Sequence, residues 1–286
     1  FVPQVARALA EGQPARCSSG RQLRDLEDVR DMGHAIALLA ASDLTGAIFR
    51  GADLTETNLS NCILGGATFA DARMMRTNLE GADLAAVSLE GAFMTEVRMA
   101  HAKYPVDPLR IGFDLAAAVA EHAKWIDTEG REGKQLDLEA YDFTAADLSG
   151  ARLSASKFVR CTFRKADFKG ADLSFANLTG CQFVGAYLNG IKGRGANFSK
   201  ANLMGADLRG ADLSALPLAP GSARASWPTR LADIQATGAM LSGAKLTDAN
   251  LRRAVLRGAD LTDADARGAD MSRTDLTKAT TTNFRR

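Results

Sequence analysis

Residues 161–175 read CTFRK-ADFKG-ADLSF, which is one five-residue unit written three times without a gap. The third residue of each unit is large and apolar, namely Phe163, Phe168 or Leu173, and the first residue is small. We number each unit from i−2 to i+2 around this central residue i. A period of five fits neither the 3.6-residue turn of a helix nor the two-residue alternation of a strand. The pattern therefore indicates a chain that turns a corner every five residues.

The same unit extends far along the chain in both directions. Residues 42–101 hold twelve units, residues 136–215 hold sixteen and residues 239–278 hold eight, and the phase does not slip inside any block. These thirty-six units account for 180 of the 286 residues. A repeat on this scale decides the architecture before any single motif does.

Four such corners close a square coil of about twenty residues, and coils stacked ~4.7–4.9 Å apart can pair their backbone groups as a ladder. The large residue at i and the small residue at i−2 then point inward, while Asp or Asn at i−1 and Gly at i+2 suit tight corners. Two units, residues 191–195 and 234–238, carry the large residue at i−2 and a small one at i, so the enclosed volume is conserved. We predict an all-β solenoid, a quadrilateral β-helix.

Units such as ADLTE, ADLSG, ANLTG and ADLRG resemble those of the bacterial pentapeptide-repeat family. The resemblance covers nearly two thirds of the chain. It implies a right-handed quadrilateral β-helix that is often dimeric. Members of that family act as binding scaffolds, as secreted effectors or as DNA-mimicking partners of DNA gyrase, so the resemblance implies binding and no single partner.

The segments between the repeats predict how the chain is divided. We expect these parts: an N-terminal segment 1–41, a first solenoid of three coils 42–104, a helical connector 105–135, a second solenoid of four coils 136–215, a loop 216–228, a third repeat block 229–278 that continues the second solenoid, and a tail 279–286. Two solenoid bodies are favoured. The alternative is one continuous tower with the connector helix on its side.

Two helices are expected outside the repeats. Apolar residues at helical spacing between residues 21 and 41 predict a capping helix that covers the open ladder edge. In the connector, Asp107 is expected to cap a helix that begins at Pro108 and ends by Gly130. The stretch from His122 to Lys134 resembles a lead-in found before solenoids of this family, which favours a new solenoid near residue 136.

Charge and hydropathy exclude some partners. With 35 Lys plus Arg against 34 Asp plus Glu the formal net charge is +1, so the chain lacks the field that attracts bulk DNA or an anionic membrane. No apolar run approaches the ~20 residues that span a bilayer. Because the numbering starts at Phe1 and not at Met, a removed or missing N-terminal segment stays open.

No catalytic or metal-binding constellation is present in the sequence. Cys62, Cys161 and Cys181 occupy the inward i−2 position, so we interpret them as core thiols, which suits a reducing cytoplasm. The three His are far apart, and Asp recurs at i−1 as a corner residue. No nucleophile elbow, phosphate loop or HExxH motif occurs. We expect no enzyme activity, no cofactor, no metal and no small-molecule substrate.

Two groups of outward residues are candidate binding surfaces. A basic patch is predicted on one coil, and it could meet an acidic protein or a phosphate backbone or be ordinary solvated surface: Lys157, Arg160, Arg164, Lys165 and Lys169. Apolar residues stand where the repeat expects polar ones, and they could meet a partner, a second copy or the chain's own helix: Ile48, Ile63, Met75 and Phe93.

The leading hypothesis is a non-enzymatic protein-protein interaction scaffold or adaptor, with a protein partner or a homodimer. One alternative is a gyrase-binding regulator of the DNA-mimic type, but the first block carries only about four more acids than bases at outward positions, which is mild for a mimic. The other alternative is nucleic-acid binding through the basic patch, which the neutral net charge does not favour.

Overall fold

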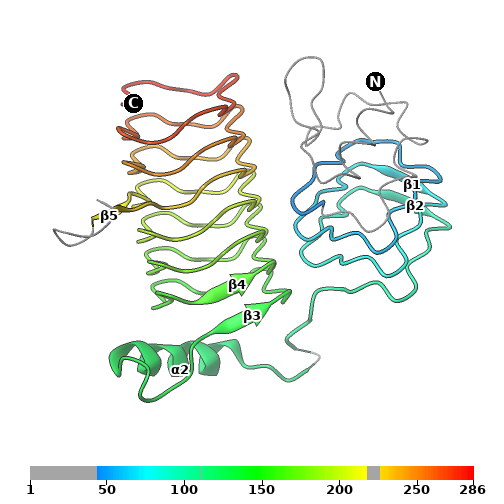
Figure 1. Cartoon of the computed structure of the whole chain (residues 1–286), viewed down its shortest axis with the longest axis horizontal. Coiled ribbons are helices and arrows are strands. Elements are labelled where there is room, and N and C mark those ends of the chain that lie inside the picture. Colours follow the sequence, from blue (N-terminus) through cyan, green and yellow to red (C-terminus); the bar gives the residue numbers. More distant parts are fainter. Residues whose placement is uncertain (1–43, 110, 218–225) are drawn as a thin grey trace. The chain divides into compact units, whose positions relative to one another are not determined.

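The computed structural model describes residues 44–109, 111–217 and 226–286, and the capping helix predicted over residues 21–41 lies outside them. The chain divides into two compact units, Phe1–Pro105 and Val106–Arg286. We call their solenoids the first and the second tower. In each tower the chain winds into stacked coils (Figure 1).

Each coil pairs in parallel with the coil twenty residues further on. Ile48 bridges Thr68 and Thr68 bridges Ser88, and the N–H of Phe49 donates to the carbonyl of Thr68 at 2.7 Å. Two parallel pairs of three-residue strands occur in the ladders: β1 (Arg73–Met75) pairs with β2 (Phe93–Thr95), and β3 (Asp137–Glu139) pairs with β4 (Lys157–Val159). The predicted β-helix solenoid is confirmed, and its right-handed winding stays a prediction.

The core consists of the i and i−2 side chains, stacked in columns. Phe163 and Phe183 lie one coil apart with ring centroids at 5.3 Å, and Leu173 and Cys181 are fully buried. At the inverted unit, Ile191 is 1% exposed, and a Cβ on Gly193 would lie 2.7 Å from Cδ2 of Leu213. Cδ1 of Ile191 lies 3.7 Å from the same Cβ position, so Ile191 and Leu213 together fill the space that a large residue at i fills elsewhere.

The corners are built by positions i−1 and i+2. Residues at i+2 adopt a left-handed backbone: Gly150 has φ +62° and Ala145 has φ +59°. The carboxylate at i−1 accepts the backbone N–H two residues later, as Asp147 does from Ser149 at 3.0 Å. The side chain thereby closes the turn that the backbone makes.

The connector helix α2 spans Leu115–Asp127, and the expectation that it begins at Pro108 is wrong. Asp114, and not Asp107, is the N-cap, since its side chain accepts the N–H of Ala117 at 3.0 Å. Gly112 has φ +65°, a left-handed conformation that would interrupt a helix running on from Pro108. Asp107 instead accepts the N–H of Leu109, two residues later. The preceding residue Val106 already belongs to the ladder of the second tower, where it bridges Tyr141.

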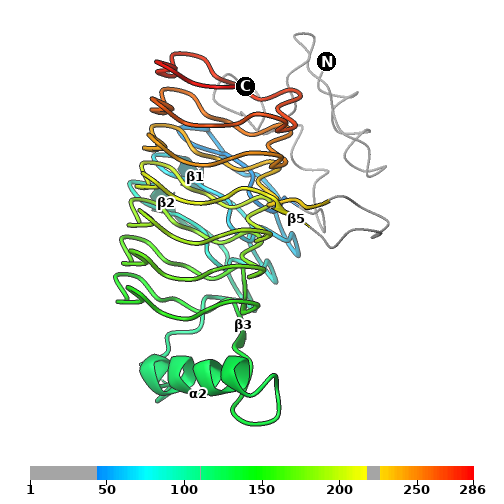
Figure 2. The ribbon, with the colours of Figure 1, turned by 90° about the vertical axis from the view of Figure 1, so that its left-hand side faces the viewer.

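Helix α2 covers the first coil of the second tower (Figure 2). Its side chains Leu115, Ala118 and Val119 pack against the tower core. His122 is fully buried between helix and coil, with Nε2 at 3.0 Å from the carbonyl of Ser154 and Nδ1 at 3.1 Å from the N–H of Leu136. The helix therefore closes the apolar end of the solenoid with both packing and specific hydrogen bonds.

The ladder of the second tower runs on into the third repeat block. Asn197 bridges Arg230 and Asp212 bridges Lys245, so the step along the chain is 33 residues here and not 20. The additional residues form an excursion at one corner. Its ends pair as two antiparallel strands, β5 (Leu216–Pro217) and β6 (Ser226–Trp227), where a loop was expected.

Residues 279–286, which we predicted as a tail, continue the ladder. Thr280 bridges Asp260 and Arg285 bridges Asp265, so these residues complete the last coil. The sequence hides this unit because Thr281 stands at i, and the large residue, Phe284, stands at the next i−2 position, where it packs against the core. The inverted arrangement is the one already found at Ile191.

Candidate interaction surfaces

Most carboxylates of the towers are committed to the fold. Asp at i−1 accepts the N–H at i+1 in unit after unit, with bonds of 2.9–3.2 Å: Asp53, Asp83, Asp142, Asp147, Asp167, Asp172, Asp212, Asp260, Asp265, Asp270 and Asp275. Hydrogen bonds from Ser149 lower the pKa of Asp147, as expected for a carboxylate that accepts N–H and O–H donors. Asp147 therefore stays ionised at neutral pH, which does not suit a general acid. Among the described residues no three His, Cys, Asp or Glu side chains gather to hold a metal ion.

The buried thiols are unsuited to nucleophilic chemistry. The Cys181 thiol lies 2.7 Å from the carbonyl oxygen of Phe158, and the Cys161 thiol lies 3.5 Å from that of Leu138. Burial raises the pKa of Cys161 to about 12 and also raises that of Cys181. Both thiols are therefore protonated at neutral pH, and together with Cys62 they fill the small-residue columns.

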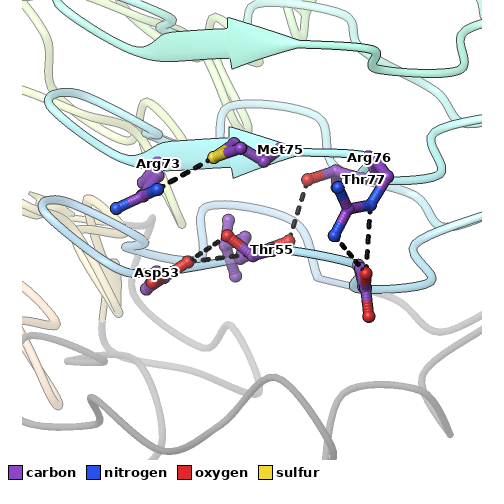
Figure 3. A network of polar contacts seen from close by, with 8 residues as sticks. Asp53, Thr55, Arg73, Met75, Arg76 and Thr77 are labelled. Atoms are coloured by element: carbon purple, nitrogen blue, oxygen red, sulfur yellow. Dashed lines mark hydrogen bonds and ion pairs between the residues drawn. The ribbon is translucent and has the colours of Figure 1, made fainter.

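Met75 and Phe93 lie on the same side of neighbouring coils of the first tower. Phe93 of β2 pairs directly with Arg73 of β1 and is 58% exposed. The guanidinium of Arg73 lies against Met75, with Nη2 3.0 Å and Nε 3.1 Å from the sulfur (Figure 3). Arg73, Met75 and Phe93 thus form an exposed surface of mixed apolar and cationic character, which we call the Phe93 surface.

The polar residues around the Phe93 surface bond to their own coil or to the adjacent one. On the coil below, Asp53 accepts both the N–H and the hydroxyl of Thr55 (Figure 3). Next to Met75, Arg76 pairs with Glu56, and the hydroxyl of Thr77 donates to the carbonyl of Leu54 at 2.8 Å. The Phe93 ring therefore stands on a backbone that its neighbours fix in place.

Ile48 and Ile63 do not join this surface. Ile48 is 8% exposed, so it adds no exposed apolar area to this surface. A side chain at i−1 points out of its own coil, but whether it meets water depends on what lies against that side. Thr68 and Ser88 of the same column are equally buried. Ile63 is 41% exposed but belongs to a different side of the coil, where it bridges Asp83.

The five basic residues predicted as one patch occupy three successive corners of their coil. Lys157 pairs with Asp137 at 2.9 Å, and Arg160 pairs with Glu139, both one coil below. Lys169 contacts Asp167 at 3.1 Å and lies 4.7 Å from the ring centroid of Tyr187. Arg164 and Lys165 share the corner between them. These carboxylate contacts and the change of side reduce the field that the five could present together.

A second aromatic surface was not expected from the sequence. Trp227 of β6 packs edge-on against Phe175 with centroids at 6.5 Å, donates its indole N–H to the carbonyl of Gly195 and lies under the guanidinium of Arg230. Trp227 and Phe175 remain 38% and 45% exposed. The sequence did offer two signs of this surface, namely the aromatic Phe175 at an i+2 corner and Trp227 in a segment outside the repeats. Their proximity could not be predicted, because only the stacking of the coils brings them together.

The repeat units of both towers match a known protein family. A family model described as pentapeptide repeats matches in eight copies, over residues 37–71, 62–100, 146–183, 181–214 and 230–280. No curated protein is similar enough in sequence to count as a match. Within the described residues, no helix has the length and apolar character that crossing a membrane requires.

Several solved structures resemble the chain at low superposition scores. HetL of the cyanobacterium Nostoc, a protein involved in heterocyst differentiation regulation, is 24% identical, with 86% of this chain and 89% of HetL covered and a TM-score of 0.30. A protein of the Arabidopsis thaliana thylakoid lumen is 27% identical over 43% of this chain and 66% of its own, with a TM-score of 0.22. Full-length QnrB1, a plasmid-mediated fluoroquinolone resistance protein, is 19% identical over 81% and 78%, with a TM-score of 0.19.

Proposed function

The chain belongs to the pentapeptide-repeat family, and from that premise we propose that it is a non-enzymatic interaction scaffold whose first tower binds a protein partner. The observation that carries the proposal is the exposure of Phe93 beside Met75 and Arg73 on a rigid ladder. Exposed aromatic, Met and Arg side chains are enriched where proteins bind one another.

The composition of the Phe93 surface favours a protein over a nucleic acid. A base or sugar-phosphate chain needs several cations that can neutralise phosphates, but Arg73 is the one cation of this surface and its guanidinium lies on a sulfur. A DNA mimic needs a surface of one sign, whereas Arg76 and Glu56 stand paired on the adjoining corners. A protein groove with an acidic rim suits both the ring and the guanidinium.

We place the protein in a compartment that keeps thiols reduced. Cys62, Cys161 and Cys181 are buried and form no disulfide, and Cys161 and Cys181 stand on successive coils. Buried thiols without disulfides are typical of the cytoplasm. This assignment favours a cytoplasmic scaffold.

The proposal is tested by replacing Phe93 and comparing the proteins captured. The full chain is used as bait in native lysate, and captured proteins are quantified by mass spectrometry after crosslinking. Phe93→Ser should lose a partner that the unaltered chain retains. Tyr187→Ser is the matched control, since Tyr187 is an aromatic residue 45% exposed on the second tower. Equal capture by all three proteins, or a monomer by light scattering with no specific partner, would contradict the proposal.

A further inference from the structure

One side of the second tower carries a column of alternating charges. The i−1 residues on this side follow one another directly in the ladder: Arg152, Asp172, Lys192, Asp212, Lys245, Asp265 and Arg285. We call these seven residues the charge column. Its four basic members are exposed and its three acidic members are half-buried, so the whole length of the column faces outward. The order is basic, acidic, basic, without an exception over seven coils.

The repeat itself does not require this order. The other three i−1 columns of the tower do not alternate: they read Asp137, Lys157, Asn177, Asn197, Arg230, Asn250, Asp270; Asp142, Thr162, Gln182, Asn202, Gln235, Val255, Asp275; and Asp147, Asp167, Tyr187, Asp207, Met240, Asp260, Thr280. Corner chemistry favours Asp, which accepts the N–H at i+1, as Asp172 does from Ser174 at 2.9 Å. Lys or Arg at i−1 cannot accept that N–H, so a basic residue at every second level needs another reason.

Alternation has one consequence inside the tower and one outside it. Inside, each Asp has a basic neighbour on the coil above and on the coil below, which favours the native stacking. Outside, a column of alternating sign is complementary to a reversed copy of itself that is shifted by one coil. In such a pair every basic level faces an acidic one, whereas an unshifted reversed pair places like charges together.

We propose that two copies of this chain associate side by side and antiparallel through the charge column of the second tower. A two-fold axis between the levels of Lys192 and Asp212 places Lys192 opposite Asp212 of the partner subunit and Asp172 opposite the partner's Lys245. The same axis generates each contact twice, as a self-complementary interface requires. This surface is separate from the Phe93 surface, and it goes beyond the function proposed above.

The i+1 residues of that side leave room for the approach. The i+1 residues beside the column are mostly small: Ser154, Ser174, Ser214 and Thr247. Its two large members, Arg194 and Arg267, lie at levels that face Ser214 and Ser154 of the partner subunit, so no cation meets a cation there. At the end of the column, Arg152 already pairs with Asp127 of α2 through bonds of 2.6 and 2.9 Å. The four central pairs therefore carry the interface.

The association should be weak and sensitive to salt. Six facing levels are separated by five steps of ~4.8 Å and so extend over about 24 Å, which places the contact at the small end of specific interfaces. Its basic groups are exposed and its acidic groups are half-buried, and the Debye length is only about 8 Å at physiological ionic strength. Self-association is thus expected at low salt and high protein concentration, and should diminish as salt is added.

Sedimentation equilibrium of the full chain at low salt tests the surface by charge reversal. Lys192→Glu and Asp212→Lys should each weaken the dimer by roughly tenfold or more, because each change places like charges at two symmetry-related contacts. The double variant Lys192→Glu/Asp212→Lys should dimerise again, since Glu and Lys then face each other across the interface. Lys165→Glu, the same charge change at an exposed corner on another side, should leave the dimer intact.

Stability measurements separate the interface from the tower's own ladder. The double variant still places Asp172 beside an acidic residue and Lys245 beside a basic one within the tower, so its melting temperature should stay reduced while its dimer returns. A chain that is monomeric at all concentrations at low salt overturns the proposal. So does a dimer that survives both single changes, or one that the double variant fails to restore. None of these changes lies on the Phe93 surface, so capture of a protein partner by the first tower should be the same for every variant. Failure of the dimer proposal is thereby distinguished from failure of the proposed function.

Discussion

The Nδ1 atom of His122 in helix α2 accepts the backbone N–H of Leu136, where the first coil of the second tower begins, at 3.1 Å. The Nε2 atom lies 3.0 Å from the carbonyl of Ser154, so the ring carries its proton on Nε2 and is neutral. Burial lowers the pKa of His122, with the charge of Arg152 acting in the same direction and the bond to Ser154 acting against it. Protonation of Nδ1 would replace an acceptor by a second donor facing the N–H of Leu136.

Acid should therefore loosen the capping helix. The unfolded chain binds a proton at His122 near its ordinary pKa of about 6.5, and the folded chain binds it only at lower pH. The stability contributed by the neutral ring is present above that ordinary value and is lost as pH falls below it. Thermal unfolding followed by circular dichroism between pH 7.5 and 5 should show a falling melting temperature. His122→Asn, which keeps an acceptor but does not titrate, should show a smaller decrease, and an equal decrease would contradict the assignment.

The register of the repeat predicts opposite tolerance at adjacent positions. Leu173 is fully buried, and Leu173→Asp would bury an unpaired charge, which costs about 3–5 kcal/mol when no partner is available. We expect the second tower to unfold or to melt far lower. Ser174→Asp stands at an outward i+1 position and should change the free energy of unfolding little. Equal melting temperatures for the two variants would refute the inside and outside assignment.

The inverted unit at residues 191–195 predicts a compensating pair of substitutions. Ile191→Ala should cost about 2–5 kcal/mol because it empties a filled site. Gly193→Leu alone should cost about 1–3 kcal/mol, since even its Cβ would lie 2.7 Å from Leu213. The double variant restores the usual order of small and large residues, so its cost should be well below the sum. Additive losses in a denaturant titration would show that the two sites do not share one volume.

The left-handed backbone at the corners predicts that adding a methyl group to a glycine lowers stability, whereas removing it from an alanine does not. Ala145 and Gly150 occupy the i+2 position at successive corners of one coil, with φ +59° and +62°. A Cβ on Gly150 would have no atom within 4 Å, so Gly150→Ala tests backbone strain alone. We expect it to destabilise by about 1 kcal/mol, and Ala145→Gly to be neutral or stabilising by up to about 1 kcal/mol. Chemical unfolding measures both, and stabilisation by Gly150→Ala would contradict the role of φ.

Several features of the fold were predictable because they depend on near neighbours in sequence. The five-residue period predicts that Leu173 and Cys181 point inward, independently of the rest of the chain, and both are fully buried. Volume conservation identified Ile191 as an inward residue, and it is 1% exposed. The start of α2 was not predictable in this way, since Asp107 and Asp114 are both good N-cap residues. The place of Val106 in the ladder and the backbone of Gly112 decide between them.

The surfaces required the tertiary structure. Ile48 and Phe93 stand at the same i−1 position of their units, yet one is 8% exposed and the other 58%, so the position within the unit does not by itself fix exposure. The charge column passes from Asp212 to Lys245 across the excursion that contains β5 and β6. By itself the sequence determined which side chains point inward, since five-residue spacing and side-chain volume are local properties. Only the stacking of coils 20 or 33 residues apart decided which outward residues lie side by side, because those neighbours are chosen by the ladder and not by adjacency in the chain.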